Sequence, residues 1–249
     1  MTTTRILVIA GSDSGGGAGI QADIKTITML GGHAMTAITA VTAQNTQSVS
    51  AVHGVPAEIV LAQIDAVMAD LGVDAVKIGM IGSPFAALHV AERLQALEGV
   101  PVVFDPVMVA TSGAILADEA TVAAFERLMK LAALTTPNVP ELEALGGRQA
   151  MAARGIAYLA KGGDAEGPRV EDALVRPGES DRVWRSPRIA TRHSHGTGCT
   201  LSSAIATLLG RGLPLEDAIL QAREFVRAAI LAAPGFGAGH GPMGHQAVR

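Results

Sequence analysis

The feature that most constrains the fold is a regular alternation of short apolar runs with longer amphipathic segments. Strands that alternate with helices predict an α/β fold, here a three-layer α/β/α sandwich with a mostly parallel central sheet and helices on both faces. The apolar runs typical of buried strands are residues 5–10, 34–41, 75–78, 102–105, 133–135 and 156–161, and helical patterns occupy residues 18–30, 57–71, 83–97 and 118–131.

Local signals at the ends of these segments agree with this interpretation. Ser83 followed by Pro84 is typical of a helix start, because serine caps the first turn and proline fits its first position. In the second half we expect a strand at residues 172–175 and an edge strand at 182–190, since Pro187 disfavours a central position. Two long helices, residues 198–210 and 215–232, and an irregular tail from residue 234 complete the prediction.

Size and charge limit the classes of function. The 249 residues fit a single α/β domain, which we expect to span residues 1–249. The net charge is −4 and no long basic run occurs, so nucleic acid and anionic membranes are not expected partners. The one cysteine, Cys199, excludes an intrachain disulfide. No apolar stretch approaches the roughly 20 residues of a membrane span, and we expect a cytoplasmic protein.

Glycine, proline or polar residues follow six of the predicted strands. In open α/β sheets, ligands bind beyond the carboxyl ends of the strands. We therefore expect these strand ends to converge and form a site, and they are residues 11–14, 44–45, 79–80, 105–106, 137–138 and 161–163.

A glycine-rich segment, residues 11–19, joins the first strand to a helix. It is not a Walker loop, because Gly17 stands where that loop needs lysine. Ile20 and Ala22 stand where the dinucleotide pattern needs its third glycine. Two interpretations stay open: a plain turn that needs positive φ, or a backbone that approaches a ligand closely, with the Asp23 carboxylate pointing at the same ligand.

The segment from His195 to Cys199, His-Gly-Thr-Gly-Cys, directly precedes a predicted helix. Gly196, Thr197 and Gly198 would present free N–H groups and the positive end of the helix dipole, which is a site for an anion. In a kinase it would hold the transferring phosphoryl group, and the dipole would lower the pKa of Cys199. The alternative is that Thr197 is a simple N-cap and Cys199 a buried, inert residue.

Acidic and amide side chains at other strand ends indicate a magnesium site. Asp105, Asn138 and Glu141 offer the oxygen ligands that Mg²⁺ prefers, and Lys161 could place an ammonium on a phosphate. The alternative is that Asn138 and Glu141 cap a helix and that Lys161 is merely solvated. His193 and His195 lie on one face of a strand, but no further metal ligands adjoin them, so zinc is not expected.

In this order, the motifs resemble the ribokinase superfamily. Within it they resemble the hydroxymethylpyrimidine/phosphomethylpyrimidine kinases of thiamine biosynthesis. The resemblance covers nearly the whole chain, through residues 10–23, 39–46, 77–80, 105–109, 136–138, 161–163, 193–202 and the tail motif 239–242 with His245. It implies a ribokinase-like fold.

The resemblance also implies roles for residues at the substrate end. Gln44 would pair with the ring nitrogen and the amino group of a pyrimidine, since an amide offers a donor and an acceptor together. Gly11, Met80 and Val107 would line the pocket, and Asp23 would contact the hydroxymethyl arm of the substrate.

At the phosphate end, the resemblance implies that Asp105 and Glu141 belong to the magnesium region and act through water. Lys161, Asn138 and Thr197 would bind ATP, with Lys161 on its phosphates. Gly196, Thr197 and Gly198 would form the anion hole.

Cys199 stands where most of the superfamily has an aspartate as the catalytic base. The kinase subtype shares this cysteine, and a thiol with a pKa near neutrality would suit a base. Two departures from the family pattern are Thr111, where many members have lysine, and the loop at residues 165–170, which leaves the nucleotide side undefined.

The implied activity is transfer of the ATP γ-phosphoryl group, with Mg²⁺, to 4-amino-5-hydroxymethyl-2-methylpyrimidine and then to its monophosphate. One alternative is a pyridoxal kinase of the same superfamily. Another is a pyrimidine-binding protein without catalysis. The resemblance also implies a homodimer.

Overall fold

The computed structural model describes residues 3–248 and contains one nine-stranded sheet in the order β3-β2-β1-β4-β5-β6-β7-β8-β9. The strands from β2 to β7 in this order pair in parallel, and the outer pairs β2–β3, β7–β8 and β8–β9 are antiparallel. The mostly parallel sheet is therefore confirmed. The strands are β1 (Arg5–Asp13), β2 (His33–Gln44), β3 (Val49–Gly54), β4 (Ala75–Ile78), β5 (Val102–Phe104), β6 (Leu134–Thr135), β7 (Tyr158–Ala160), β8 (Arg169–Val175) and β9 (Arg182–Pro187).

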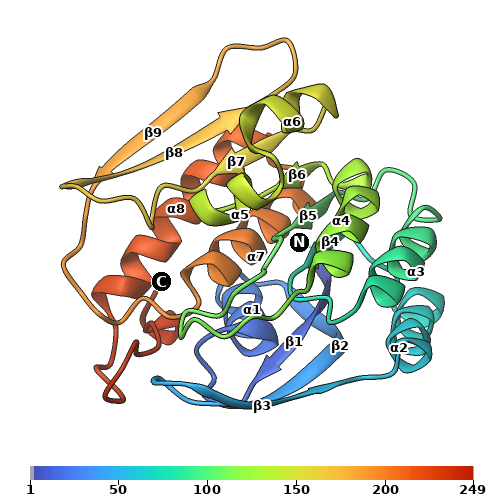
Figure 1. The fold of residues 1–249 in the computed structure, drawn as a ribbon, viewed down its shortest axis with the longest axis horizontal. Helices are drawn as coiled ribbons and strands as arrows, with labels where there is room; N and C mark the ends of the chain where they lie inside the picture. The colour runs from blue at the N-terminus through green and yellow to red at the C-terminus, as the bar shows by residue number, and fades with distance from the viewer. Residues whose placement is uncertain (1–2, 249) are drawn as a thin grey trace.

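Helices cover both faces of this sheet (Figure 1), which confirms the predicted three layers. One face carries α1 (Gly19–Met29), α7 (Thr197–Gly210) and α8 (Leu215–Leu231). The other carries α2 (Ala57–Asp70), α3 (Pro84–Leu94), α4 (Glu119–Leu131) and α6 (Gly147–Ala153), and α5 (Val139–Ala144) follows β6.

The two apolar cores follow from the alternation of side chains along the strands. In β1, Leu7 and Ile9 pack against the α2–α4 side, whereas Ile6 and Val8 pack against α1 and α7. All four are fully buried. A strand that is covered on both faces reads as a continuous apolar run, which is why these strands could be predicted.

The predicted helix start at Ser83 is confirmed. Its side chain accepts a hydrogen bond from the Ala86 N–H at 3.1 Å, and Pro84 is the first helical residue. The edge position of β9 is also confirmed, and the strand ends at Pro187.

Four elements were not predicted. Strand β3 is mostly exposed and so lacks an apolar run. Helices α5 and α6 have six and seven residues, too few for a helical period to stand out. The tail ends in a short 3₁₀ turn, His245–Ala247.

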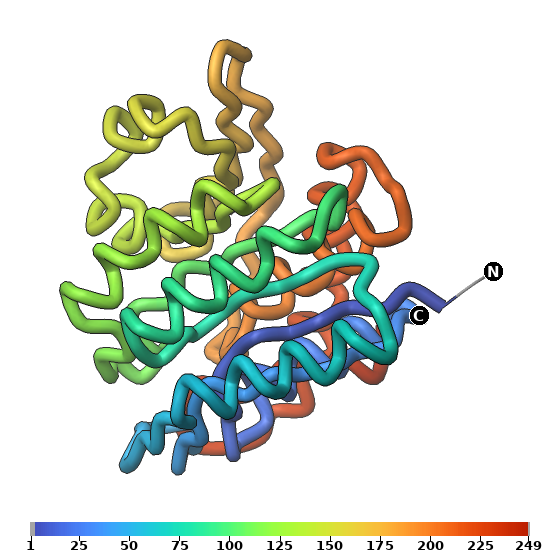
Figure 2. The backbone as a smooth tube through the Cα atoms, turned by 90° about the vertical axis from the view of Figure 1, so that its right-hand side faces the viewer, coloured from blue at the N-terminus to red at the C-terminus, as the bar shows by residue number. Residues whose placement is uncertain are grey.

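The arrangement of the elements leaves the carboxyl ends of the parallel strands at one edge of the sheet. Figures 1 and 2 both show the β8–β9 hairpin extending beyond the rest of the sheet, beside α5 and α6. Among residues 3–248, no helix combines the length and the apolar character that crossing a membrane requires.

Candidate active site

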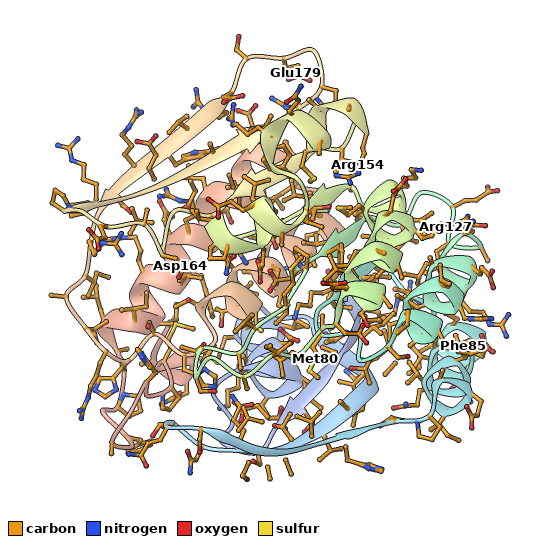
Figure 3. The ribbon with its side chains drawn as sticks, in the orientation of Figure 1. Met80, Phe85, Arg127, Arg154, Asp164 and Glu179 are labelled. Atoms are coloured by element: carbon orange, nitrogen blue, oxygen red, sulfur yellow. The ribbon has the colours of Figure 1, made fainter. Side chains whose placement is uncertain are left out.

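A cavity of about 670 Å³ opens at the carboxyl ends of the strands. All six predicted strand ends contribute to its lining, so the structure brings them together. Met80 and Asp164, two of its residues, are labelled in Figure 3. Besides Met80, the predicted site residues in the lining are Gly11, Gln44, Asp105, Val107, Asn138, Glu141, Lys161, Gly196, Thr197, Gly198 and Cys199.

The glycine-rich turn is folded around a carboxylate. Asp13, the last residue of β1, accepts hydrogen bonds from the N–H groups of Gly15 (2.7 Å), Gly17 (3.0 Å) and Ala18 (2.8 Å). Because these groups bind Asp13, they are not free for a phosphate. Burial acts to raise the pKa of Asp13, but the hydrogen bonds from His195 and the backbone lower it overall.

The same turn approaches the rest of the cavity closely. Gly11 lies so near Met80 that a Cβ on Gly11 would come 3.0 Å from the Met80 Sδ atom. Both residues line the cavity together with Ala18 and Gly19. The turn uses positive φ at Gly16 (73°) and Gly19 (55°), so the plain-turn interpretation is confirmed, and the close approach to a ligand stays a prediction.

His195 contacts three parts of the cavity wall. Its Nε2 atom lies 3.0 Å from Asp13 Oδ2 and 3.1 Å from Gln44 Nε2, and its Nδ1 atom lies 3.1 Å from Thr111 Oγ1. The residue is only 6% exposed. The sequence did not single out the His195 side chain as a part of the substrate end.

The N-terminus of α7 faces the cavity. Gly196 is the N-cap, with a left-handed φ of 84°, and no side chain caps the helix. The interpretation of Thr197 as the N-cap was therefore wrong. A Cβ on Gly196 would overlap the carbonyl oxygen of Gly17, so the position requires glycine.

The helix N-terminus, a cation and a carboxylate meet at one place. A Cβ on Gly198 would lie 3.2 Å from Lys161 Nζ and 3.6 Å from Asp105 Oδ2. Lys161 Nζ is 2.7 Å from Asp105 Oδ1 and 3.8 Å from Glu141 Oε2. The positive helix end and the ammonium together favour a bound anion.

Asn138 and Glu141 form a capping box at the start of α5. The Asn138 side chain accepts from the Glu141 N–H, and the Glu141 carboxylate accepts from the Asn138 N–H, both at 2.8 Å. The capping interpretation is thus correct, yet both residues also line the cavity. Burial, together with the charge of Asp105, raises the pKa of Glu141 to about 7 against the opposing charge of Lys161.

The Asp105–Glu141 pair fits a hydrated Mg²⁺ ion. Burial acts to raise the pKa of Asp105, but the charges of Lys161 and Lys77 lower it, so this carboxylate stays ionised. No group of three or more His, Cys, Asp or Glu residues suited to a metal occurs within residues 3–248. Mg²⁺ needs only one or two protein carboxylates when water and phosphate supply the other ligands.

Asp23 does not reach the cavity. Its side chain is fully buried, accepts hydrogen bonds from Lys77 Nζ at 3.0 and 2.9 Å, and accepts from Ser203 Oγ at 2.6 Å. The expectation that Asp23 contacts a substrate arm was therefore wrong for this structure. The physical reason is that the buried Lys77 of β4 needs a counter-charge, and Asp23 of α1 forms the ion pair with it.

Lys77, which the sequence analysis did not assign, lines the cavity. A signal for it was present, because a lysine within the fully buried strand Ala75–Ile78 must have a partner.

Cys199 has a raised pKa. Burial raises it to about 11, the negative charges of Asp23 and Asp105 act in the same direction, and Lys77 opposes them. The expectation that the helix dipole brings this pKa toward neutrality was wrong, because burial beside two carboxylates outweighs it.

A second cavity of about 340 Å³ adjoins the first and shares Lys161, Thr197 and Gly198 with it. In its lining, Asp172 Oδ1 accepts from the Gly162 N–H at 2.9 Å, and Asp172 Oδ2 accepts from Arg223 Nε at 2.6 Å.

The loop after Gly163, which departs from the family pattern, is held by Arg188. Its guanidinium donates to the carbonyl oxygens of Gly163, Ala165 and Gly167. Gly163 and Arg188 also line the second cavity.

Comparison with known proteins identifies the family. A family model described as phosphomethylpyrimidine kinase matches residues 13–244. The hydroxymethylpyrimidine/phosphomethylpyrimidine kinase of Rhizobium meliloti is 47% identical, over 98% of this chain and 97% of that protein. The thiamine biosynthesis bifunctional protein ThiED of Geobacter sulfurreducens is 46% identical over 96% of this chain, and the chain spans about half (52%) of its length.

A solved structure supports the fold. An ADP complex of Bacillus subtilis pyridoxal kinase superposes with a TM-score of 0.89 at 31% identity, covering 100% of this chain and 99% of that one.

Proposed function

The chain belongs to the phosphomethylpyrimidine kinase family, and we propose that it phosphorylates 4-amino-5-hydroxymethyl-2-methylpyrimidine and then the resulting monophosphate, in thiamine biosynthesis. The observation that carries this proposal is one cavity that is lined both by an amide, Gln44, and by the α7 N-terminus with Lys161. Such a cavity suits a small heterocycle that bears a phosphate acceptor.

At the substrate end, Gln44 pairs with the ring nitrogen and the adjacent amino group. A carboxamide suits this pair because it donates and accepts side by side. Gly11, Met80 and Val107 form the walls around the ring. The orientation places the hydroxymethyl group toward Cys199 and the helix N-terminus.

At the phosphate end, the Gly198 N–H group and the Lys161 ammonium stabilise the negative charge of the transferring group, whereas the Thr197 N–H donates to the Ser194 carbonyl oxygen at 3.3 Å. Burial opposes the charge of Lys161, but Asp105 and Glu141 raise its pKa, so the ammonium is retained at physiological pH. Transfer then depends mainly on positioning and charge stabilisation.

We propose Cys199 as the group that takes the hydroxyl proton of the substrate. Burial raises the pKa of its thiol to about 11, so the thiol must first release its own proton to water, and the resulting thiolate then accepts the hydroxyl proton as that oxygen bonds to phosphorus. A loose phosphoryl-transfer transition state does not require early removal of the proton. Lys77 lowers the pKa of Cys199 and offsets part of the burial.

ATP is the proposed donor, with its phosphates beside Lys161 and Gly198, which line both cavities, and the remainder in the second cavity. Asp105 and Glu141 would hold Mg²⁺ through water, and the ion would neutralise charge on the phosphate oxygens. Asn138 and Thr197 are proposed neighbours of the nucleotide, because both line the large cavity near Lys161.

A pyridoxal kinase is the second candidate, favoured by the similarity to the Bacillus subtilis enzyme. Both candidates predict ATP consumption, so a coupled ADP-release assay with each alcohol compares their kcat/KM values. A pyrimidine value at least tenfold above the pyridoxal value supports the first candidate, and the reverse order supports the second. Binding of the pyrimidine without ADP release would indicate a non-catalytic protein.

The single domain over residues 1–249 and the homodimer stay predictions. Light scattering of the purified chain measures the second directly.

A further inference from the structure

The bonding around His195 fixes where its hydrogen lies. The ionised Asp13 carboxylate can only accept, and it already accepts three backbone N–H groups. The Nε2 atom of His195, 3.0 Å from Asp13 Oδ2, therefore carries a hydrogen and donates it. In the neutral ring, Nδ1 is then an acceptor and receives the hydroxyl hydrogen of Thr111 at 3.1 Å.

The imidazole is held rigidly in this position. The His195 N–H donates to the Gly241 carbonyl oxygen at 3.2 Å. On the other side, the ring touches the glycine-rich turn so closely that a Cβ on Gly17 would overlap its Cδ2 atom. The ring is thus a fixed part of the wall between the turn and the tail.

Gln44 rests against this fixed ring. Its backbone is tied to the turn, because its N–H donates to Ser14 Oγ and its carbonyl oxygen accepts from Ser14 Oγ, both at 2.8 Å. Its amide has two polar neighbours among the described residues, His195 Nε2 at 3.1 Å and Thr42 Oγ1 at 3.3 Å.

The contact between Gln44 and His195 fixes which way the amide faces. Two N–H donors 3.1 Å apart would repel each other, so the Nε2–H group of His195 faces the amide oxygen of Gln44, the amide group being turned by 180°. Thr42 Oγ1 donates its hydrogen to the Ser12 carbonyl oxygen and therefore accepts from the amide NH2 group. The second amide hydrogen and the second lone pair of the amide oxygen stay available to a ligand in the cavity.

We propose that His195 is a specificity-determining positioning residue, which holds the Gln44 amide in the orientation that pairs with a ring nitrogen next to an amino group. The chemistry it selects is an aminopyrimidine alcohol over an alcohol of the same shape without the amino group. Thr111, on the loop that lines the cavity at residues 107–111, supports the ring from its second nitrogen. This inference rests on the proposed function and adds a residue to its substrate end.

The inference is tested by measuring ligand binding in the absence of ATP. Two ligands are each measured with the native protein and with a His195 variant, so that the change in preference between the ligands can be calculated. Calorimetry measures Kd for the aminopyrimidine alcohol and for 5-hydroxymethyl-2-methylpyrimidine, which lacks the amino group. In the native protein we expect a preference of about tenfold or more for the amino compound, the equivalent of about 1.4 kcal/mol. In His195→Leu we expect this preference to fall to about twofold, with little change for the compound without the amino group.

Two further variants make the result independent of the folding of His195→Leu. Gly17→Ala pushes against the imidazole ring and should reduce the preference in the same way. Gly54→Ala is its control, because a Cβ there has no atom within 4 Å, and it should keep the native preference. His195→Gln, which retains an N–H that can reach Asp13, should recover part of the preference.

The outcomes separate this inference from the proposed function. Unchanged preference in both His195→Leu and Gly17→Ala would overturn the role of His195 while the pyrimidine-kinase proposal stands. An equal loss of affinity for both ligands would also overturn it, because it would mean that His195 only supports the fold. Absence of any pyrimidine binding by the native protein would overturn both.

Discussion

Lys77 Nζ lies 2.9 Å from Asp23 Oδ2, and neither side chain is exposed to solvent. The pair joins β4 to α1, and Ser203 of α7 donates to the same carboxylate at 2.6 Å. Lys77 also lines the cavity, where its charge lowers the pKa of Cys199. One buried ion pair thus links three elements of the fold to the reactive end of the site.

Removal of one partner of this pair should destabilise the fold strongly. We expect Asp23→Asn to lower the free energy of unfolding by about 3–5 kcal/mol, because it leaves a buried ammonium without its counter-charge. Urea unfolding measures the change. The exposed pair Lys130–Glu126 is the control, and Glu126→Gln should cost no more than about 0.5 kcal/mol. Equal small effects in both variants would contradict the assignment of Asp23 to the structural pair.

Cys199 should affect turnover more than binding. We expect Cys199→Ala to reduce kcat at least tenfold and to change the Kd of the pyrimidine less than threefold. Steady-state kinetics and calorimetry give the two values. Equal losses in both would mean that Cys199 packs against the substrate and takes no part in the transfer.

Alkylation of Cys199 by iodoacetamide provides a second measurement on the same residue. Only the thiolate reacts, and burial raises the pKa to about 11. The alkylation rate should therefore still be rising at pH 10. A plateau between pH 7 and 9 would instead support the lowered pKa that the helix dipole alone predicts.

His245 should make the tail sensitive to acid. Burial lowers the pKa of His245 to about 4, and its Nε2 atom lies 2.8 Å from Thr200 Oγ1 of α7. As the pH falls from about 6.5 to 4, His245 binds a proton in the unfolded chain but stays neutral in the folded chain. The free energy of unfolding therefore declines in this interval. We expect His245→Gln to flatten the fall of Tm with pH relative to the exposed control His53→Gln. Parallel curves for both variants would contradict this.

Asp172 should affect the binding of ATP and not the binding of the pyrimidine. It holds the Gly162 N–H next to Lys161 and is itself held by Arg223. We expect Asp172→Asn to raise the KM for ATP about fivefold to tenfold and to leave the KM for the pyrimidine unchanged. Glu171→Gln is the matched control, since Glu171 is the neighbouring residue in β8 and forms an exposed pair with Arg185. A rise in both KM values would indicate a general distortion of the site.

Much of the site was predictable because parallel strands end at one edge. The polar residues after β1, β4, β5 and β7 each follow an apolar run, and topology then brings them to one cavity. The capping box of Asn138 and Glu141 was also visible, because its residues are three apart in the chain. These are local signals, and the fold preserves them.

The wrong predictions concern how deeply a side chain is buried and which distant residues contact it. Neither can be read from the neighbouring sequence. From the sequence, Asp23 was predicted to lie near a ligand. In the structure it pairs with Lys77, which is 54 positions later in the chain. The pKa of Cys199 depends on burial and on Asp105, which a helix-terminus argument leaves out. His195 was identified as part of an anion hole, but its contact with Gln44 joins residues 151 positions apart.

The central claim is that this cavity transfers phosphoryl groups to an aminopyrimidine alcohol. Its most direct test is mass spectrometry of the products formed by the purified chain with Mg-ATP and 4-amino-5-hydroxymethyl-2-methylpyrimidine. We predict the monophosphate first and the diphosphate later, and a loss of at least a hundredfold in rate for Lys161→Met. A correctly folded native chain that binds the pyrimidine but forms neither phosphate at saturating Mg-ATP would contradict the claim.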